Sequence, residues 1–255
     1  MVELSGCSFL ENIRRFEVER VRAFFEPAIS VLEIGGADGC QASVIASWGC
    51  SIRSLDIAER PEYEKTYYRV ETYNGSHIPF PAAHFDILFS SNVLEHVRDI
   101  PSMLEEIHRV LKNDGVCIQI LPSPAWRFWT MVTHYPSLLM SAIREGRGEA
   151  HPYNHPPEKS SHKRTLGDKL KQAFFPPPHG EYRTSISELY YFSAHRWKQV
   201  FRMHGFQILR IQPAGLFYTG HFLYPGLSLT LRHSLASIGG SAMLIYILKK
   251  APEGP

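Results

Sequence analysis

A short glycine-rich segment carries the residue types that hold a nucleoside. An apolar run ends in the turn Glu33-x-Gly35-x-Ala37-x-Gly39, and the next apolar run ends in Asp56. Glycines let a backbone turn sharply and approach a ligand closely. A carboxylate about 20 residues after such a turn can accept hydrogen bonds from both hydroxyl groups of a ribose. These spacings predict a βαβ unit that binds a nucleoside at the carboxyl ends of its strands.

The same turn argues against a ligand with a pyrophosphate. A dinucleotide fingerprint needs glycines where the backbone meets the phosphates and where the helix packs on the strand. Ala37 and Cys40 occupy those places, and Asp38 puts a negative charge where the pyrophosphate would sit. A cofactor with adenosine and no phosphates fits better. We expect S-adenosylmethionine (SAM), and a nicotinamide cofactor is a distant alternative.

Further segments follow the turn and the acid in a fixed order. Ile78-Pro-Phe80 precedes Phe85-Asp86, and Asn92-Val-Leu-Glu-His96 follows it. With these motifs the chain resembles the class I SAM-dependent methyltransferases, in particular the type 11 group, closely over residues 28–123. A looser likeness returns from 192 to 206. The resemblance implies a SAM-dependent methyltransferase.

The resemblance also implies roles for individual polar side chains. Glu33 would accept from the methionine ammonium, and Asp56 would accept from the ribose. Asn74 would accept from the adenine amine, where relatives often have Asp, and Asn92 would line the cleft near the methyl group. The predicted cofactor-binding residues are Glu33, Gly35, Gly36, Ala37, Gly39, Asp56, Ile57, Asn74, Gly75 and Asn92.

Three histidines are the predicted catalytic residues. Methyl transfer from a sulfonium is an in-line displacement, in which the protein mainly positions the reactants. A hydroxyl or amine acceptor also loses a proton, so a base can contribute. His96, at the end of the fourth strand, and His134 and His179, in the insert, are the predicted bases. Glu181 is a further candidate in the insert, and a scaffold role is the alternative for His96. We expect no metal site, because the histidines at 151, 155 and 162 lie in a proline-broken run without nearby Cys or paired acids.

The order of apolar runs predicts an α/β fold. Strands are expected near 30–35, 51–56, 67–72, 85–90 and 115–121, with an antiparallel closing pair near 208–211 and 243–248. Helices are expected between them and over 9–25, which gives a doubly wound, mostly parallel, seven-stranded sheet. Three regions are expected: a SAM-binding core (1–123), an inserted acceptor or lid region (124–185) and the C-terminal part of the core (186–255).

Two aromatic regions bear on the acceptor. Trp126, Phe128 and Trp129 begin the insert, where they either stack on an acceptor or pack the insert onto the core. Residues 213–231 contain no Asp, Glu, Lys or Arg, and their prolines and glycines argue against a membrane-spanning helix. We expect the two regions to form one lid, with a membrane-interface surface as the alternative.

Composition sets broad limits on the partners and the compartment. The chain has 255 residues, a net charge of +2 and 44% hydrophobic residues, typical of a globular protein without a nucleic-acid footprint. Its 4 cysteines lack a paired spacing, which favours free thiols in a reducing compartment. No signal peptide is apparent at the start. We expect a cytoplasmic protein, and the charge-poor segment leaves peripheral membrane contact open.

These inferences converge on methyl transfer to a small-molecule, saccharide- or lipid-linked acceptor, with oxygen the preferred atom. A C-methyltransferase acting on an apolar ring, such as a quinone precursor, is the alternative within enzymes. A non-catalytic binding protein with the same fold is the alternative outside them.

Overall fold

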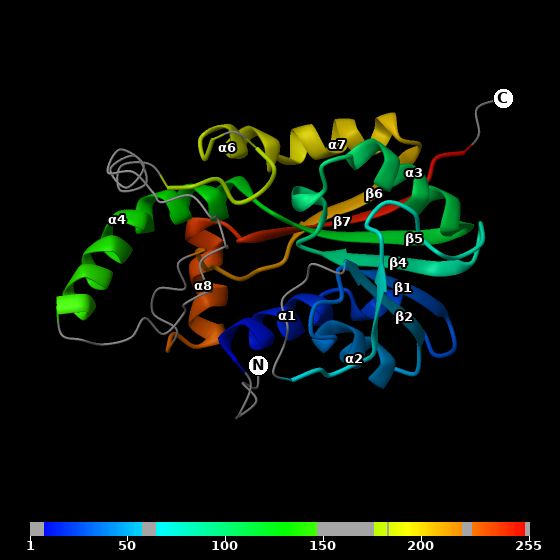
Figure 1. The fold of residues 1–255 in the computed structure, drawn as a ribbon, viewed down its shortest axis with the longest axis horizontal. Helices are drawn as coiled ribbons and strands as arrows, with labels where there is room; N and C mark the ends of the chain where they lie inside the picture. The colour runs from blue at the N-terminus through cyan, green and yellow to red at the C-terminus, as the bar shows by residue number, and fades with distance from the viewer. Residues whose placement is uncertain (1–7, 58–64, 147–175, 183, 221–225, 253–255) are drawn as a thin grey trace.

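The computed structural model describes residues 8–57, 65–146, 176–182, 184–220 and 226–252. A seven-stranded sheet runs through the middle of the molecule, in the order β3-β2-β1-β4-β5-β7-β6 (Figure 1). The first five strands in that order are parallel, and β7 pairs antiparallel with both β5 and β6. The strands are β1 (Ser30–Ile34), β2 (Ser51–Ile57), β3 (Val70–Tyr73), β4 (Phe85–Ser91), β5 (Leu111–Pro122), β6 (Phe206–Pro213) and β7 (Met243–Lys250).

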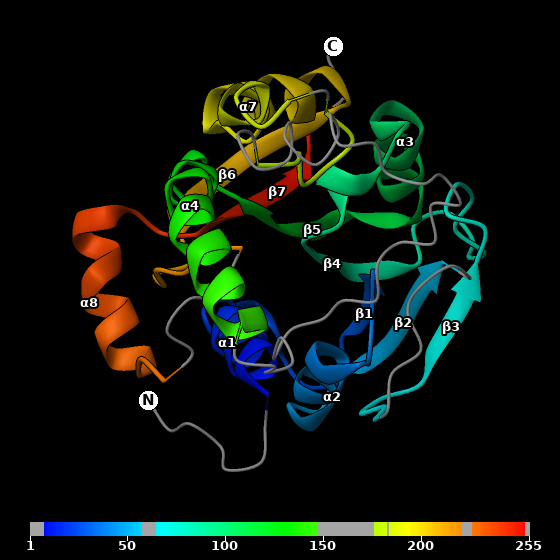
Figure 2. The same cartoon turned by 60° about the vertical axis from the view of Figure 1, so that its left-hand side comes forward.

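Helices cover both faces of the sheet. Figures 1 and 2 show α1 and α2 on one face and α3 and α7 on the other, while α4 extends beyond the end of the sheet near α8. The helices are α1 (Phe9–Glu19), α2 (Cys40–Ser47), α3 (Ile100–Val110), α4 (Pro124–Gly146), α6 (Ser187–Tyr191), α7 (Ala194–Met203) and α8 (Leu229–Gly239), with short 3-10 turns η1 (Arg22–Phe24) and η2 (Leu94–His96).

Alternation along the central strands produces a separate core on each face. Val31 on β1 and Phe89 on β4 are fully buried in the cluster that includes α1 and α2. Their neighbours Leu32 and Leu88 are fully buried in the cluster under α3 and α7. Because successive side chains of a strand point to opposite faces, runs that are apolar at every position suit a sheet covered on both sides. The predicted doubly wound, seven-stranded fold is confirmed.

The edges of some elements differ from the prediction. α1 ends at Glu19, not near 25, and continues as the tighter turn η1. Val21 and Phe25, which flank that turn, are both buried, which explains why the apolar spacing continued beyond the helix. Strand β3 begins at Val70, and β5 is longer than predicted, at 12 residues.

The aromatic region after β5 begins as a single long helix. α4 has 23 residues and contains Pro136. Among the helices that the structure describes, none is both long and apolar enough to cross a membrane. The polar run 151–164, with its three histidines, lies outside the described residues.

Candidate functional site

The turn after β1 packs tightly between two other strands. Gly35 has a φ of +79°, and a Cβ there would lie 2.2 Å from the Val93 side chain that follows β4. A Cβ on Gly36 would lie 2.0 Å from the hydroxyl oxygen of Ser54 on β2. The backbone amides of both glycines donate to the carbonyl of Leu55. This turn therefore needs glycine at both positions.

Asp56 lies directly against this turn. Its Oδ2 accepts from the backbone amide of Ala37 at 2.8 Å, and its Oδ1 accepts from that of Ile57 at 2.7 Å. The carboxylate is half-buried and its orientation is fixed. Each carboxylate oxygen can accept a further hydrogen bond, so Asp56 can still accept from the two ribose hydroxyl groups. That contact stays a prediction.

Glu33, on β1 just before the turn, contacts β2 through Ser54. Its side chain is buried and accepts a hydrogen bond from the Ser54 hydroxyl. Burial, with a smaller contribution from Asp56 and Asp38, raises the pKa of Glu33 to about 7. The Ser54 contact links Glu33 to β2 next to the turn. The contact of Glu33 with the methionine ammonium stays a prediction.

Three predicted cofactor-binding residues, Ile57, Asn74 and Gly75, lie where β2 and β3 end. A Cβ on Gly75 would lie 3.1 Å from Cγ2 of Ile57, whose side chain is exposed. Asn74 forms a turn of its own: its Oδ1 accepts from the backbone amides of Ser76 and His77 at 3.0 and 2.8 Å. Its carbonyl oxygen thus already has two donors, so its contact with adenine stays a prediction.

Asn92 adopts a left-handed conformation directly after β4, with φ +57°. Its backbone amide donates to the carbonyl of Ile120 at 2.8 Å, and its Nδ2 donates to Ser91 Oγ at 3.0 Å. These contacts hold the residue at the carboxyl edge of the sheet, beside the segment that packs on Gly35. This is where a doubly wound fold binds its ligand.

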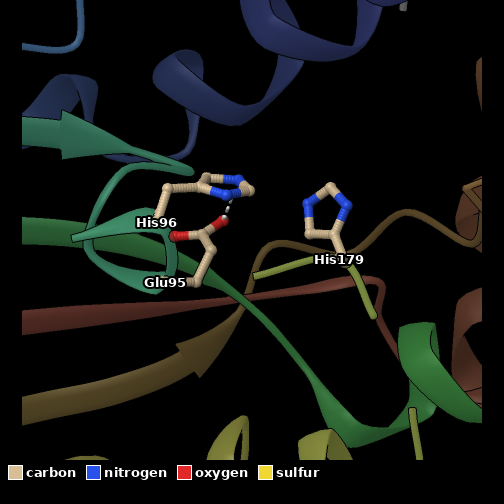
Figure 3. A group of neighbouring side chains, drawn as sticks. All are labelled: Glu95, His96 and His179. Atoms are coloured by element: carbon tan, nitrogen blue, oxygen red, sulfur yellow. Dashed lines mark ion pairs between the residues drawn. The ribbon is translucent and has the colours of Figure 1, made fainter. Parts of the chain in front are cut away.

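The structure brings together two of the three predicted histidines. The ring centroids of His96 and His179 lie 4.8 Å apart in an edge-to-face arrangement (Figure 3). Partial burial lowers the pKa of His96, and partial burial together with the charges of His96 and Arg127 lowers that of His179. His134 is buried on α4 against Tyr135 and is not part of this pair.

Sequence reasoning missed Glu95, which lies beside this pair. It precedes His96 in the same motif, which was the available signal, but 83 residues separate His96 from His179. A buried ion pair also went unpredicted: Arg127 Nε on α4 lies 2.9 Å from Glu188 Oε2 on α6. The Glu188 carboxylate accepts from the backbone amides of His179 and Gly180, which positions His179.

The two predicted lid regions contact each other in their described parts. The Trp129 ring on α4 lies 5.6 Å from the Phe217 ring, and its Nε1 donates to the carbonyl of Gly239 at 2.8 Å. The backbone amide of Gly220 donates to Thr130 Oγ1 at 2.9 Å. Trp126 is buried, and Phe222 lies outside the described residues.

A sheet in this order, with a glycine turn after β1 and an acid at the end of β2, defines the class I methyltransferase fold. The comparisons agree with this class: a family model described as a methyltransferase domain matches residues 9–211. The chain belongs to this family, and the predicted class and its cofactor, SAM, are confirmed.

Similar proteins cover different parts of the chain. A rat protein named "Arginine-hydroxylase NDUFAF5, mitochondrial" is 51% identical over 71 residues, which are 26% of this chain and 21% of the relative. A Mycolicibacterium smegmatis protein named "Probable S-adenosylmethionine-dependent methyltransferase" is 31% identical over 97 residues, 36% of this chain and 38% of that protein. The chain therefore spans well under half the length of these relatives.

A solved structure with the same fold covers most of the chain. It is the 1,6-didemethyltoxoflavin N1-methyltransferase of Burkholderia thailandensis, determined with bound 1,6-didemethyltoxoflavin and S-adenosylhomocysteine. It has a TM-score of 0.53 and 14% identity, and it covers 94% of this chain and 79% of its own. At this identity the likeness shows the fold alone.

Proposed function

We propose that this protein transfers the methyl group of SAM to an oxygen atom of a small-molecule, saccharide- or lipid-linked acceptor. The contact between Asp56 and the Ala37 amide is the observation that most directly supports SAM as the methyl donor, because it places a carboxylate beside a turn that suits a nucleoside. Two neighbouring imidazoles, His96 after β4 and His179 in the segment 176–182, support an acceptor that loses a proton. The cytoplasmic location stays a prediction.

We further propose that α4 and the charge-poor segment act as one lid that determines acceptor choice. Trp129 supports this role, because it contacts both Phe217 and Gly239. In this arrangement the region 124–185 recognises the acceptor, while 1–123 and 186–255 form the core. The cofactor residues all precede residue 97, so changes in the lid should leave SAM binding intact.

One observation favours a second candidate role, contact with a membrane that carries a lipid-linked acceptor. Five apolar side chains on α4 are exposed at intervals of three or four residues, which places them along one side of the helix. They are Phe128, Val132, Tyr135, Leu139 and Ile143. Exposed apolar surface of this kind is typical of protein or membrane contacts. The side chain of Trp126 is buried and does not contribute to this surface.

The experiment that tests the function is product analysis with isotope-labelled SAM. The protein is incubated with panels of hydroxylated, lipid-linked and apolar ring acceptors, and products are identified by mass spectrometry. Asp56→Ala is the inactive comparison, and Glu105→Ala, at an exposed position of α3, is the matched control. Label on oxygen supports the proposal. Label on a ring carbon supports the C-methyltransferase, and SAM binding without transfer to any acceptor supports a binding protein.

The mass of the product also distinguishes methyl transfer from hydroxylation, the reaction for which the rat relative is named. A hydroxylated product gains an oxygen atom and no label from SAM, whereas a methylated product gains the labelled group. Unlabelled, oxygenated products from a SAM-loaded enzyme would overturn the proposed methyl transfer.

A further inference from the structure

The Glu95 carboxyl group is buried without a hydrogen-bond partner among the described residues. Its side chain is 1% exposed. The guanidinium of Arg14, on α1, pairs instead with Glu17 at 2.7 Å. Burying a carboxyl group without hydrogen-bond partners is costly, so buried groups of this kind in proteins are usually hydrogen-bonded, paired with a charge or bound to a metal.

Two imidazoles complete a set of ligand atoms around this carboxylate. One ligand atom each from Glu95, His96 and His179 lies within 4.8 Å of the others. Figure 3 shows Glu95 and His96 beside each other after β4, with the His179 ring facing them from the segment 176–182. His96 Nε2 lies 3.9 Å from Glu95 Oε1. Two ligands that bind one ion at about 2.0–2.2 Å lie at most about 4.4 Å apart, so metal binding requires the rings to move inward from these positions.

The approach of His179 to Glu95 is built into the backbone. The Glu181 amide donates to the Glu95 carbonyl at 3.2 Å, and a Cβ on Gly180 would lie 2.4 Å from that carbonyl oxygen. From the other side, the amides of His179 and Gly180 donate to Glu188. The ring of His179 also packs edge-to-face against Trp126, with centroids 4.7 Å apart. Contacts of this kind fix the orientation of metal ligands.

We propose that Glu95, His96 and His179 form a binding site for a divalent transition-metal ion. One carboxylate and two imidazoles suit Zn²⁺, Mn²⁺, Fe²⁺ or Co²⁺. Three protein ligands leave coordination positions open, as in catalytic metal sites. The site follows β4 directly, next to Val93, whose side chain contacts Gly35 of the cofactor turn. An open position of the metal therefore lies near the carboxyl edge where the cofactor is expected.

The role of the metal rests on the proposed function. In this site His96 and His179 bind the ion and do not accept a proton themselves. A hydroxyl oxygen of the acceptor binds the ion, which lowers the pKa of that hydroxyl, and its proton passes to solvent. An oxygen lone pair then forms the O–CH₃ bond as the C–S bond of SAM breaks. The electron pair of that bond remains on sulfur in S-adenosylhomocysteine, and the metal ion is unchanged.

Metal titration tests the site without any acceptor. Protein stripped with a chelator is titrated with Mn²⁺, Zn²⁺ or Co²⁺ by calorimetry, and the d–d absorption of bound Co²⁺ reports the ligand set. We expect one equivalent to bind, with the affinity reduced by more than about 100-fold in Glu95→Gln, His96→Asn and His179→Asn. His195→Ala is the matched control, because His195 is exposed on α7. If Glu95→Gln fails to fold, the two histidine variants decide the outcome.

The result separates the metal site from the proposed function. SAM affinity should be unchanged in the chelator-treated protein, while turnover should require added metal. No stoichiometric binding of any of the three ions, or binding unaffected by the three variants, would overturn the site. A metal-binding protein that transfers no methyl group would overturn the proposed function and leave the site intact.

Discussion

The backbone amide of Ala37 donates to the carboxylate of Asp56 across 2.8 Å. This contact joins the turn after β1 to the end of β2, so the glycine segment and the acid form one structure before any ligand arrives. A carboxylate oriented in this way loses little conformational freedom on binding, which favours affinity. The residue that we expect to hold the ribose therefore also stabilises the turn that we expect to surround the cofactor.

Replacement of this acid tests the cofactor site directly. Asp56→Ala should weaken SAM binding by about 2–4 kcal/mol, because two charge-assisted hydrogen bonds to the ribose are lost. Calorimetry with SAM and S-adenosylhomocysteine measures the effect, and Glu105→Ala should bind as the unmodified protein does. Circular dichroism must show the same fold, since Asp56 also holds Ala37. Unchanged affinity in a folded Asp56→Ala variant would mean that other groups hold the ribose.

Adding a single methyl group at Gly36 tests how tightly the turn after β1 is packed. Gly36→Ala should lower the free energy of unfolding by about 1–3 kcal/mol and weaken SAM binding, because its Cβ would lie 2.0 Å from Ser54 Oγ. Gly226→Ala is the matched control, since a Cβ there meets nothing within 4 Å. Chemical denaturation and calorimetry supply the two readouts. Equal losses in both variants would show that the tight packing of the turn is not the cause.

Replacing Asn74 by aspartate should not weaken SAM binding. Its Oδ1 accepts from two backbone amides, and an aspartate would keep both acceptor contacts while adding charge. Asn74→Asp should therefore bind SAM with similar or higher affinity in the same calorimetric assay. A loss of tenfold or more, which is about 1.4 kcal/mol, would indicate that the amide group itself contacts the ligand.

The local motifs predicted the fold and the place of the cofactor site, but contacts between distant segments remained hidden. The turn after β1 and the acid at Asp56 belong to one βαβ unit, so their spacing alone was informative. The Glu95–His179 approach depends instead on Glu188 and on its buried partner Arg127, from two other helices. No periodicity links those four residues. The turn-forming role of Asn74 was visible in principle, because Asn before Gly is a common turn signal.

The ion pair between Glu106 and Arg109, both on α3, should make the free energy of unfolding depend on pH. Hydrogen bonds from the Arg109 guanidinium, with Nε 2.7 Å from Glu106 Oε1, lower the pKa of Glu106 to about 2. The pKa of this carboxyl is higher in the unfolded chain, at about 4.3. Its contribution to stability is therefore complete above about pH 5 and is lost as the pH falls toward 2. Denaturation at several pH values should show this slope, and it should be reduced in Glu106→Gln but not in Glu105→Gln.

Substitutions on α4 separate the lid from the membrane surface, because the two roles use different side chains. Trp129→Ala removes the contacts with Phe217 and Gly239, so acceptor turnover should fall while SAM affinity is retained. Deleting 151–164 should have the same pattern of effects. Leu139→Glu changes a side chain that is 64% exposed, so the lid role predicts near-normal turnover of a soluble acceptor. If instead the protein sediments with anionic liposomes, and Leu139→Glu releases it while Trp129→Ala leaves soluble-acceptor turnover unchanged, then α4 serves as a membrane contact and not as part of a lid.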